Sequence, residues 1–397
     1  MNPVSALPAI AAIALALITA NIISRLSKAP PKGGRFDTID GLRGYLALFV
    51  FLHHSSIWYF YLRTGRWETP PSNLYTHFGQ DSVALFFMIT SFLFFTKILN
   101  QNRNAIDFSR IYVGRILRLF PLYAFAVLIM MGVIIVLSKF EIHRAPWALS
   151  KELLKWVTFT IFGAPTINAI AETNLIVAGV TWSLPYEWFF YLCLPALAFV
   201  AGHRPPRVIS AFGIASVLAF VAWKPNVHHI FSFGLGIASA YLVRFRGFRS
   251  FAKGRLATFF ICTALSCLVA LFPTAYDFEP LVLLAIAFSL IAGGNAFFGV
   301  LSSTTSKALG ELTYSLYLLH GIALFVTFTF VIDREQAAQL SPDLHWLIIL
   351  VLCPTLVLIC RSTFLMIEAP ALARTNQLLS WLKGRIVTKT RITVRRR

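Results

Sequence analysis

Two polar side chains, Arg43 and His54, lie at the start and in the middle of one apolar segment, residues 44–62. They are eleven positions apart, which along an α-helix corresponds to about 16 Å and nearly the same face. A neutral imidazole at this depth can act as a general base toward a hydroxyl group. Two structural alternatives remain: His54 can be bonded to a neighbouring helix, and Arg43 can simply mark a cytoplasmic helix end. His53 points about a quarter-turn away and is expected to matter less.

Arg115 and Arg118 form a second candidate site. Their i, i+3 spacing places both guanidinium groups on one helix face, just inside the membrane. Two adjacent guanidinium forks suit a phosphate or pyrophosphate group. The spacing is equally compatible with a collar of basic residues at the cytoplasmic end of a span.

Glu187 is an acidic residue within an aromatic segment that also contains Trp182 and Tyr191. An unpaired carboxylate inside a membrane is unfavourable, so Glu187 is expected to be neutral or to have a partner. We expect it about one turn below the outer surface, where a buried histidine such as His54 would be a suitable partner. Trp182 alone is typical of the aromatic belt at a membrane surface.

His320 lies in a later apolar segment, 314–332, on the same helix face as Tyr314 and Tyr317. This pattern favours a hydrogen-bonded packing stripe over a catalytic role.

The composition indicates which elements must position these residues. The chain has 397 residues, of which 57% are hydrophobic and only 13% are charged, compared with about 25% charged in soluble domains. This excludes a soluble domain, a coiled coil and a disordered chain. The net charge of +19 comes from short basic runs between apolar segments, which is typical of a membrane protein and not of a nucleic-acid-binding one. The five cysteines are odd in number and form no C-x-x-C pair, so no metal site is expected.

Apolar runs predict an all-α, polytopic membrane helix bundle. About 20 apolar residues are needed to cross a bilayer. A shorter apolar patch, 156–164, is expected to be re-entrant or to lie at the interface. The predicted spans are 6–23, 44–62, 83–98, 119–137, 184–201, 208–223, 227–243, 256–272, 280–298, 314–332 and 344–366.

The distribution of basic residues predicts the orientation. With eleven spans, most of the 35 lysines and arginines fall on one side if the carboxyl terminus is cytoplasmic and the amino terminus is outside. The localisation expected is the cell membrane, in a bacterium the inner membrane. Segment 6–23 could instead be a signal peptide, but no basic residue precedes it, which favours a membrane anchor.

In combination, these motifs resemble acyltransferase family 3, the integral-membrane acyltransferases that modify cell-surface glycans and lipids. Ser91 stands where the family usually has glycine. The resemblance divides the chain into an amino-terminal anchor and cytoplasmic linker (1–35), a ten-span acyltransferase domain (36–370) and a basic cytoplasmic tail (371–397). The matching motifs are Asp40-Gly41-Leu42-Arg43-Gly44 with His54, Phe86-Phe87 to Leu93, Arg115-x-x-Arg118-x-x-Pro121, Trp182-Ser183-Leu184 with Glu187 and Tyr191, Tyr314-Ser315-Leu316-Tyr317 with His320, and Glu368-Ala369-Pro370.

The resemblance implies transfer of an acyl group, acetyl above all, from acyl-CoA to a hydroxyl of an extracytoplasmic or lipid-linked saccharide. Acyl-CoA (acetyl-CoA) would be a co-substrate, with no permanently bound cofactor and with membrane lipid around the protein. His54 would be a general base or a covalent acyl carrier. The resemblance assigns catalysis to His54 and Glu187, donor binding to Arg43, Arg115 and Arg118, and substrate binding to Trp182, Tyr191 and His320.

A polytopic transporter or flippase with an intramembrane His/Glu proton site is the alternative from another class. Transporters of this size often contain two related halves, and no internal repeat is present here. A lipid acyltransferase of another fold is a third, less favoured interpretation.

Overall fold

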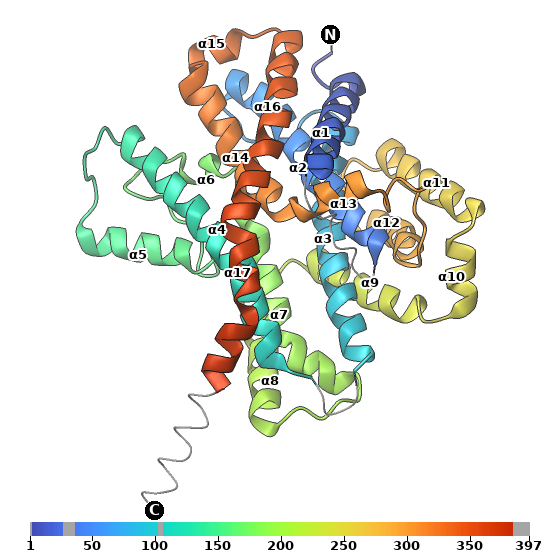
Figure 1. The fold of residues 1–397 in the computed structure, drawn as a ribbon. Helices are drawn as coiled ribbons and strands as arrows, with labels where there is room; N and C mark the ends of the chain where they lie inside the picture. Colours follow the sequence, from blue (N-terminus) through green and yellow to red (C-terminus); the bar gives the residue numbers. More distant parts are fainter. Residues whose placement is uncertain (1, 27–35, 102–105, 384–397) are drawn as a thin grey trace, which may run out of the picture.

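The computed structural model describes residues 2–26, 36–101 and 106–383. Within these ranges the chain forms helices and turns, with a single isolated bridge between Ile167 and Ile170 and no strand. The predicted all-α class is therefore confirmed (Figure 1). Linker residues 27–35 and tail residues 384–397 lie outside the described part of the chain.

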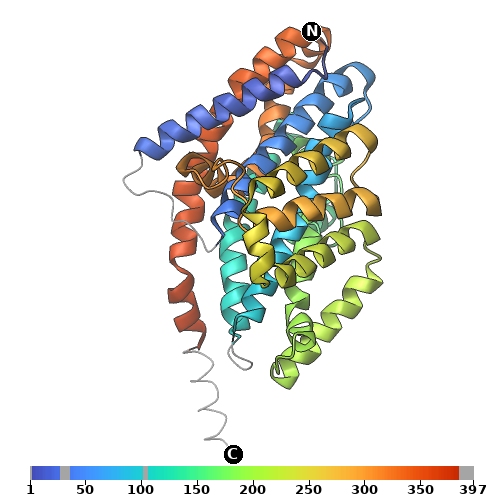
Figure 2. The same ribbon diagram turned by 90° about the vertical axis from the view of Figure 1, so that its right-hand side faces the viewer.

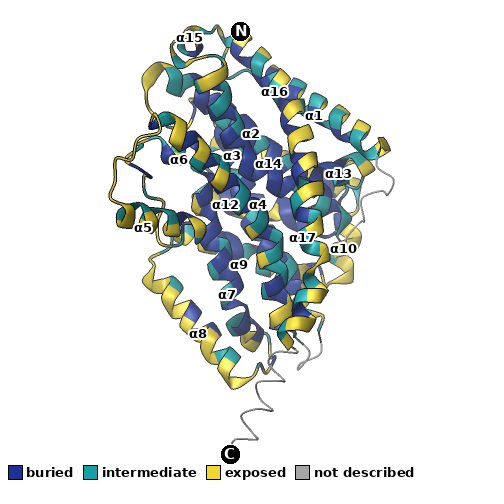
Figure 3. Cartoon of the chain, turned by 60° about the vertical axis from the view of Figure 1, so that its left-hand side comes forward, coloured by how far each residue is buried: buried dark blue, intermediate teal, exposed yellow. Residues whose placement is uncertain are grey.

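The bundle consists of longer helices, with shorter ones that connect them or cover their flanks (Figures 1 and 3). The long helices are α1 (Ala6–Leu26), α2 (Asp37–Thr64), α3 (Asn73–Leu99), α4 (Phe108–Leu137), α7 (Leu184–Val200), α11 (Arg255–Leu271) and α16 (Pro342–Thr363). The others are α5 (Pro146–Val157), α6 (Thr173–Ile176), η1 (Val180–Ser183), α8 (Arg207–Ala222), α9 (Val227–Leu242), α10 (Arg246–Ala252), α12 (Phe278–Ala292), α13 (Thr304–Glu311), α14 (Thr313–Val326), η2 (Thr327–Val331), α15 (Arg334–Gln339), η3 (Phe364–Glu368) and α17 (Ala369–Ala373).

Fewer helices are long enough to cross a membrane than the apolar runs predict. In the described residues six helices are long and apolar enough to cross a membrane, or seven if the α10–α11 pair, bent by 73°, counts as one span. Helices α8, α9 and α12 have 16, 16 and 15 residues, which is about 24 Å or less and shorter than the ~30 Å hydrocarbon core. The protein is thus a multi-pass membrane protein, and the predicted ten spans plus one are not confirmed.

Helices α2, α3 and α14 form the centre of the bundle and are buried along most of their length (Figure 3). α3 packs against both α2 and α9, and α14 packs against α2. The ends of the central helices are set locally. Ser72 accepts a hydrogen bond from the Tyr75 amide and begins α3, while Gly65, at φ 70°, ends α2.

Helix α1 packs along α16 and α13, and Figure 2 shows it crossing the bundle obliquely. Its buried face carries alanines at helical spacing, Ala9, Ala12, Ala16 and Ala20, which allow close approach of the neighbouring backbones. The Trp346 indole donates a hydrogen bond to the Pro3 carbonyl, 2.9 Å. The amino-terminal helix is therefore part of the folded bundle. The start of α1 and the end of the chain's last described helix lie at opposite ends of the molecule (Figure 1).

The 156–164 patch does not form a span. It is the end of α5 and the turn that follows, and α5 runs across α4 instead of along it (Figure 1). Trp156 anchors this turn: its carbonyl accepts from the Tyr123 hydroxyl (2.6 Å) and its indole donates to the Pro165 carbonyl (2.8 Å).

Ser91 fits the α3–α9 contact because a glycine lies opposite it. A Cβ on Gly236 of α9 would lie 2.0 Å from Ser91 Oγ and 2.2 Å from the Met88 carbonyl oxygen. Ser91 is fully buried and its hydroxyl donates to the Met88 carbonyl, 3.1 Å. The close packing expected of a glycine in the third predicted span is thus supplied by the partner helix.

Gly41 lies where α2 meets the turn before α13. A Cβ there would lie 1.9 Å from the Leu301 carbonyl oxygen, a clash with backbone that side-chain motion cannot relieve. Overpacking of this kind typically costs about 1–3 kcal/mol, so Gly41→Ala should lower the thermal unfolding midpoint by several degrees. Gly132→Ala is the matched control, because no heavy atom lies within 4 Å of its Cβ. Equal midpoints for the two variants would contradict the packing described here.

Candidate active site

A cavity of about 290 Å³ lies inside the bundle, between α2, α3, α4, α7 and α14. We call it the arginine cavity. Four basic side chains and one acidic side chain line it, and most of its remaining wall is apolar or aromatic. Its lining residues are Arg43, Val83, Phe86, Phe87, Ile89, Thr90, Leu93, Phe94, Lys97, Arg115, Arg118, Leu119, Ser183, Leu184, Glu187, Tyr191, Thr313, Tyr314 and Tyr317.

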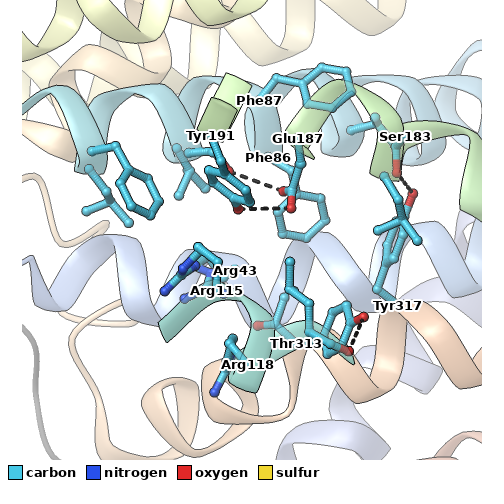
Figure 4. Close-up of a pocket in the computed structure, with 18 of the residues that line it drawn as sticks. Arg43, Phe86, Phe87, Arg115, Arg118, Ser183, Glu187, Tyr191, Thr313 and Tyr317 are labelled. Atoms are coloured by element: carbon cyan, nitrogen blue, oxygen red, sulfur yellow. Dashed lines mark hydrogen bonds between the residues drawn. The ribbon is translucent and has the colours of Figure 1, made fainter. Parts of the chain in front are cut away.

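Arg43, Arg115 and Arg118 gather at one end of this cavity, Arg43 from α2 and the other two from α4 (Figure 4). The Arg115 guanidinium lies over the Phe94 ring, 5.0 Å from its centroid, and 5.8 Å from that of Tyr191. Among the described residues, neither Arg43 nor Arg115 has a carboxylate within 4 Å. The cavity therefore contains two guanidinium groups that form no direct ion pair among the described residues, with the Glu187 carboxylate in the same cavity.

Arg118 has a carboxylate neighbour. Its Nη1 lies 3.8 Å from Glu368 Oε2, and Glu368 is fully buried. Glu368 ends the π-helical turn η3, and its other carboxylate oxygen accepts a hydrogen bond from Ser315. The Glu-Ala-Pro motif that follows α16 thus supplies the carboxylate next to Arg118, one of the arginines of the cavity.

Glu187 faces the arginines from the opposite wall (Figure 4). Its carboxylate accepts hydrogen bonds from the Tyr191 hydroxyl (3.1 Å) and the Thr90 hydroxyl (3.3 Å). Two expectations for Glu187 are corrected here: its hydrogen-bond partners are not His54, and it belongs to the arginine cavity instead of the outer surface. The reason is that α6 and η1 are partly buried and pack against α14, so that α7 begins in the interior of the bundle.

A second cavity of about 310 Å³ contains His54, and we call it the histidine cavity. Trp182 lines it and is 39% exposed, so the cavity has an open side. Its lining residues are Val50, His53, His54, Gly79, Gln80, Val83, Val180, Trp182, His229, Tyr276 and Tyr317.

Hydrogen bonds around His54 determine which ring nitrogen carries the proton. His320 Nδ1 lies 2.9 Å from the Leu316 carbonyl, so it donates, and the Nε2 of a neutral His320 is an acceptor. His54 Nδ1 lies 3.0 Å from that Nε2 and 3.0 Å from the Val50 carbonyl. It must therefore donate, which leaves His54 Nε2 unprotonated. Among the described residues this nitrogen has no hydrogen-bond partner, so it is available as a base.

The structure divides the sequence-predicted residues into two groups. Arg43, Arg115, Arg118, Glu187 and Tyr191 line the arginine cavity. The other group comprises His54 and Trp182, which line the histidine cavity, and His320, which is hydrogen-bonded to His54.

Sequence reasoning missed three residues, Thr90, Lys97 and Tyr317, as components of a site. Thr90 and Lys97 are seven positions apart on α3, which is two helical turns, so they share a face. This seven-residue spacing of two polar residues could have identified both as members of one site. Lys97 is exposed, and a further cavity of about 460 Å³ shares Leu93 and Lys97 with the arginine cavity, so the arginine cavity continues toward the end of α3.

This arrangement can bind an anion and deprotonate a hydroxyl. Unpaired buried guanidinium groups favour a phosphate ligand, the apolar wall suits an alkyl or amide chain, and His54 provides a neutral imidazole. The described residues contain no group of three or more His, Cys, Asp or Glu side chains that could hold a metal ion.

Comparison with known proteins identifies the family. Residues 36–362, most of the chain, match the sequence model of an acyltransferase domain. Neither a curated protein nor a solved structure matches the chain. Helix α1 lies outside the matched region. The chain belongs to acyltransferase family 3 and is a membrane acyltransferase with several apolar helices long enough to cross the bilayer.

Proposed function

We propose that the protein is an O-acyltransferase that moves an acyl group, acetyl above all, from acyl-CoA to a hydroxyl of an extracytoplasmic or lipid-linked saccharide. One observation carries the proposal: Arg43 and Arg115 line a largely apolar interior cavity, and among the described residues neither has a carboxylate within 4 Å. Buried charges are normally paired, and a polyanionic ligand would supply the missing partner.

Acyl-CoA fits this cavity in charge and in shape. Its phosphates would bind Arg43, Arg115 and Arg118, with Lys97 at the exposed end. Its long pantetheine arm would extend along the apolar wall, past Phe86 and Leu119, away from the arginines. The thioester would then approach the histidine cavity.

The reaction follows from the hydrogen bonds of His54. His54 Nε2 accepts the proton of the acceptor hydroxyl as the hydroxyl oxygen forms a bond to the thioester carbonyl carbon. The carbon–sulfur bond breaks, and the departing CoA thiolate takes the proton from the imidazolium. The products are an O-acyl ester and free CoA. His320 accepts from His54 Nδ1 and so keeps the correct tautomer.

The sugar ring of the acceptor would bind in the histidine cavity. Trp182 is partly exposed there and offers an apolar ring face, while Gln80 and Tyr276 offer polar groups. The open side of the cavity would face outward. Membrane lipid and a lipid-linked glycan would be the partners, and acyl-CoA would arrive from the cytoplasm.

We infer from the charge distribution that the carboxyl terminus is cytoplasmic and that the protein resides in the cell membrane. An alkaline phosphatase reporter, which is active only after export, should be inactive when fused after Arg397. The same reporter inserted between Arg66 and Pro70, before α3, should be active. The reverse pattern would contradict the proposed orientation and with it the side from which the donor enters.

The proposal is tested with the purified full-length protein in nanodiscs. We expect saturable binding of acetyl-CoA, and release of free CoA thiol that depends on an added saccharide acceptor. A protein that binds no acyl-CoA and releases no CoA with any member of a glycan panel would overturn the proposal. Proton-coupled uptake by proteoliposomes without CoA release would instead support a transporter.

A further inference from the structure

The arginine and histidine cavities lie one after the other along the same helices. On α3, Gly79 and Gln80 line the histidine cavity, while Thr90 and Lys97 line the arginine cavity. On α2 the order is reversed: Arg43 lines the arginine cavity, and His53 and His54, later in the helix, line the histidine cavity. This is the order expected if α2 and α3 are antiparallel neighbours. The two cavities are therefore stacked along the axis of the bundle.

Two side chains, Val83 and Tyr317, line both cavities. Both are buried, with 6% and 8% exposure. Figure 4 shows Tyr317 with Ser183 at the end of the arginine cavity opposite to Arg43 and Arg115. These two side chains thus form the boundary between the cavity that would bind the donor and the cavity that contains the base.

Tyr317 is held rigidly at this boundary. Its hydroxyl lies 2.8 Å from Ser183 Oγ and 3.1 Å from the Val180 carbonyl oxygen. Its ring packs edge-on against Phe86 on the arginine side, 5.8 Å between centroids, and lies 6.3 Å from His320 on the other side. Val83 is β-branched and has little rotamer freedom in a helix. Neither side chain can yield easily to a larger group.

We propose that Val83 and Tyr317 form a constriction through which the acyl group passes from the arginine cavity to His54, and that this constriction selects short acyl chains. The inference rests on the proposed function and adds to it the two residues that would admit acetyl and close homologues and exclude long acyl chains. Interiors are close-packed, so each added methylene must displace a fixed wall. A single methylene in such a pocket changes kcat/KM by about 10–200-fold.

The test is a change of donor preference in full-length protein. For wild-type protein, Val83→Ala and Tyr317→Phe, kcat/KM is measured with acetyl-, butyryl- and hexanoyl-CoA. Val83→Ala should raise the butyryl-to-acetyl ratio of kcat/KM at least tenfold. Tyr317→Phe keeps the ring but loses its anchor at Ser183, and should raise the same ratio less.

Val133→Ala is the matched control. Val133 is also a buried helical valine, 8% exposed, and lines neither cavity, so the same methyl groups are removed away from the proposed path. Its ratio should equal that of wild type. Binding of acetyl-CoA, measured by calorimetry, should stay within about twofold of wild type for Val133→Ala, which touches neither cavity.

The outcomes separate this inference from the function on which it rests. If Val83→Ala and Tyr317→Phe transfer acyl groups with the wild-type ratio, the constriction is refuted while the acyltransferase stands. If wild-type protein releases no CoA from any donor, the proposed function itself fails. If the thermal midpoint shows that Val83→Ala does not fold, the butyryl-to-acetyl ratio of Tyr317→Phe replaces it. A raised ratio then supports the constriction, and a wild-type ratio refutes it.

Discussion

Replacement of His54 by alanine should lower the rate of acyl transfer by about 10²–10⁴-fold, the typical contribution of a general base. The Nδ1 of His54 donates to the Val50 carbonyl and to His320. Its Nε2 is therefore unprotonated and can act as the base. Expression and acetyl-CoA binding should be unchanged, since His54 does not line the arginine cavity. The measurement is CoA release by purified protein at saturating donor.

His53→Ala is the matched control for His54→Ala. His53 is adjacent in sequence and lines the same cavity, but its Nδ1 bonds to the Tyr75 carbonyl, 2.7 Å, and not to His320. Its loss should be much milder. Activity of His54→Ala within about tenfold of wild type would reduce His54 to a packing role, and an essential His53 would contradict the helix-face argument. An acyl group trapped on His54 would show a covalent carrier instead of a base.

Arg115→Ala should weaken acetyl-CoA binding by about 10–100-fold, the equivalent of a hydrogen bond to a charged group, ~1.5–3 kcal/mol. Arg115 forms no direct ion pair with a carboxylate among the described residues, so its removal breaks no salt bridge. Arg115→Lys should restore binding only in part, because an ammonium group cannot form two parallel hydrogen bonds to a phosphate. Calorimetry with acetyl-CoA measures both.

Arg118→Ala should also weaken donor binding, but it leaves the fully buried Glu368 without its cationic neighbour and should lower the thermal midpoint as well. Arg110→Ala is the control for both variants, because Arg110 is an exposed arginine of α4 that does not line the cavity. Normal binding by Arg115→Ala and Arg118→Ala at limiting donor would rule out the phosphate-binding role.

Features that depend on one helix could be predicted from the sequence. The i, i+3 spacing of Arg115 and Arg118 and the eleven-residue spacing of Arg43 and His54 place side chains by helical period alone. The structure has both arginines of the first pair in one cavity. The all-α fold followed in the same way from the length of the apolar runs.

Features that join distant segments could not be predicted in this way. The partner of His54 is His320, 266 positions away, and no spacing rule links them. Glu187 lies inside because α6 and η1 pack against α14 before α7 begins, and an apolar run does not reveal such a contact. Helix α12 ends at Ala292, before the end of the apolar run 280–298, and an apolar run does not show where the helix within it ends.

We propose that this membrane acyltransferase transfers an acyl group from CoA to a surface saccharide through His54. Mass spectrometry of surface glycans tests it most directly, with cells that produce the wild-type chain, cells that produce His54→Ala and cells that lack the gene. We expect one acyl mass, an acetyl group above all, on a glycan hydroxyl in wild-type cells only. Identical glycan masses in all three would contradict it, as would an acyl mass that persists in the His54→Ala cells.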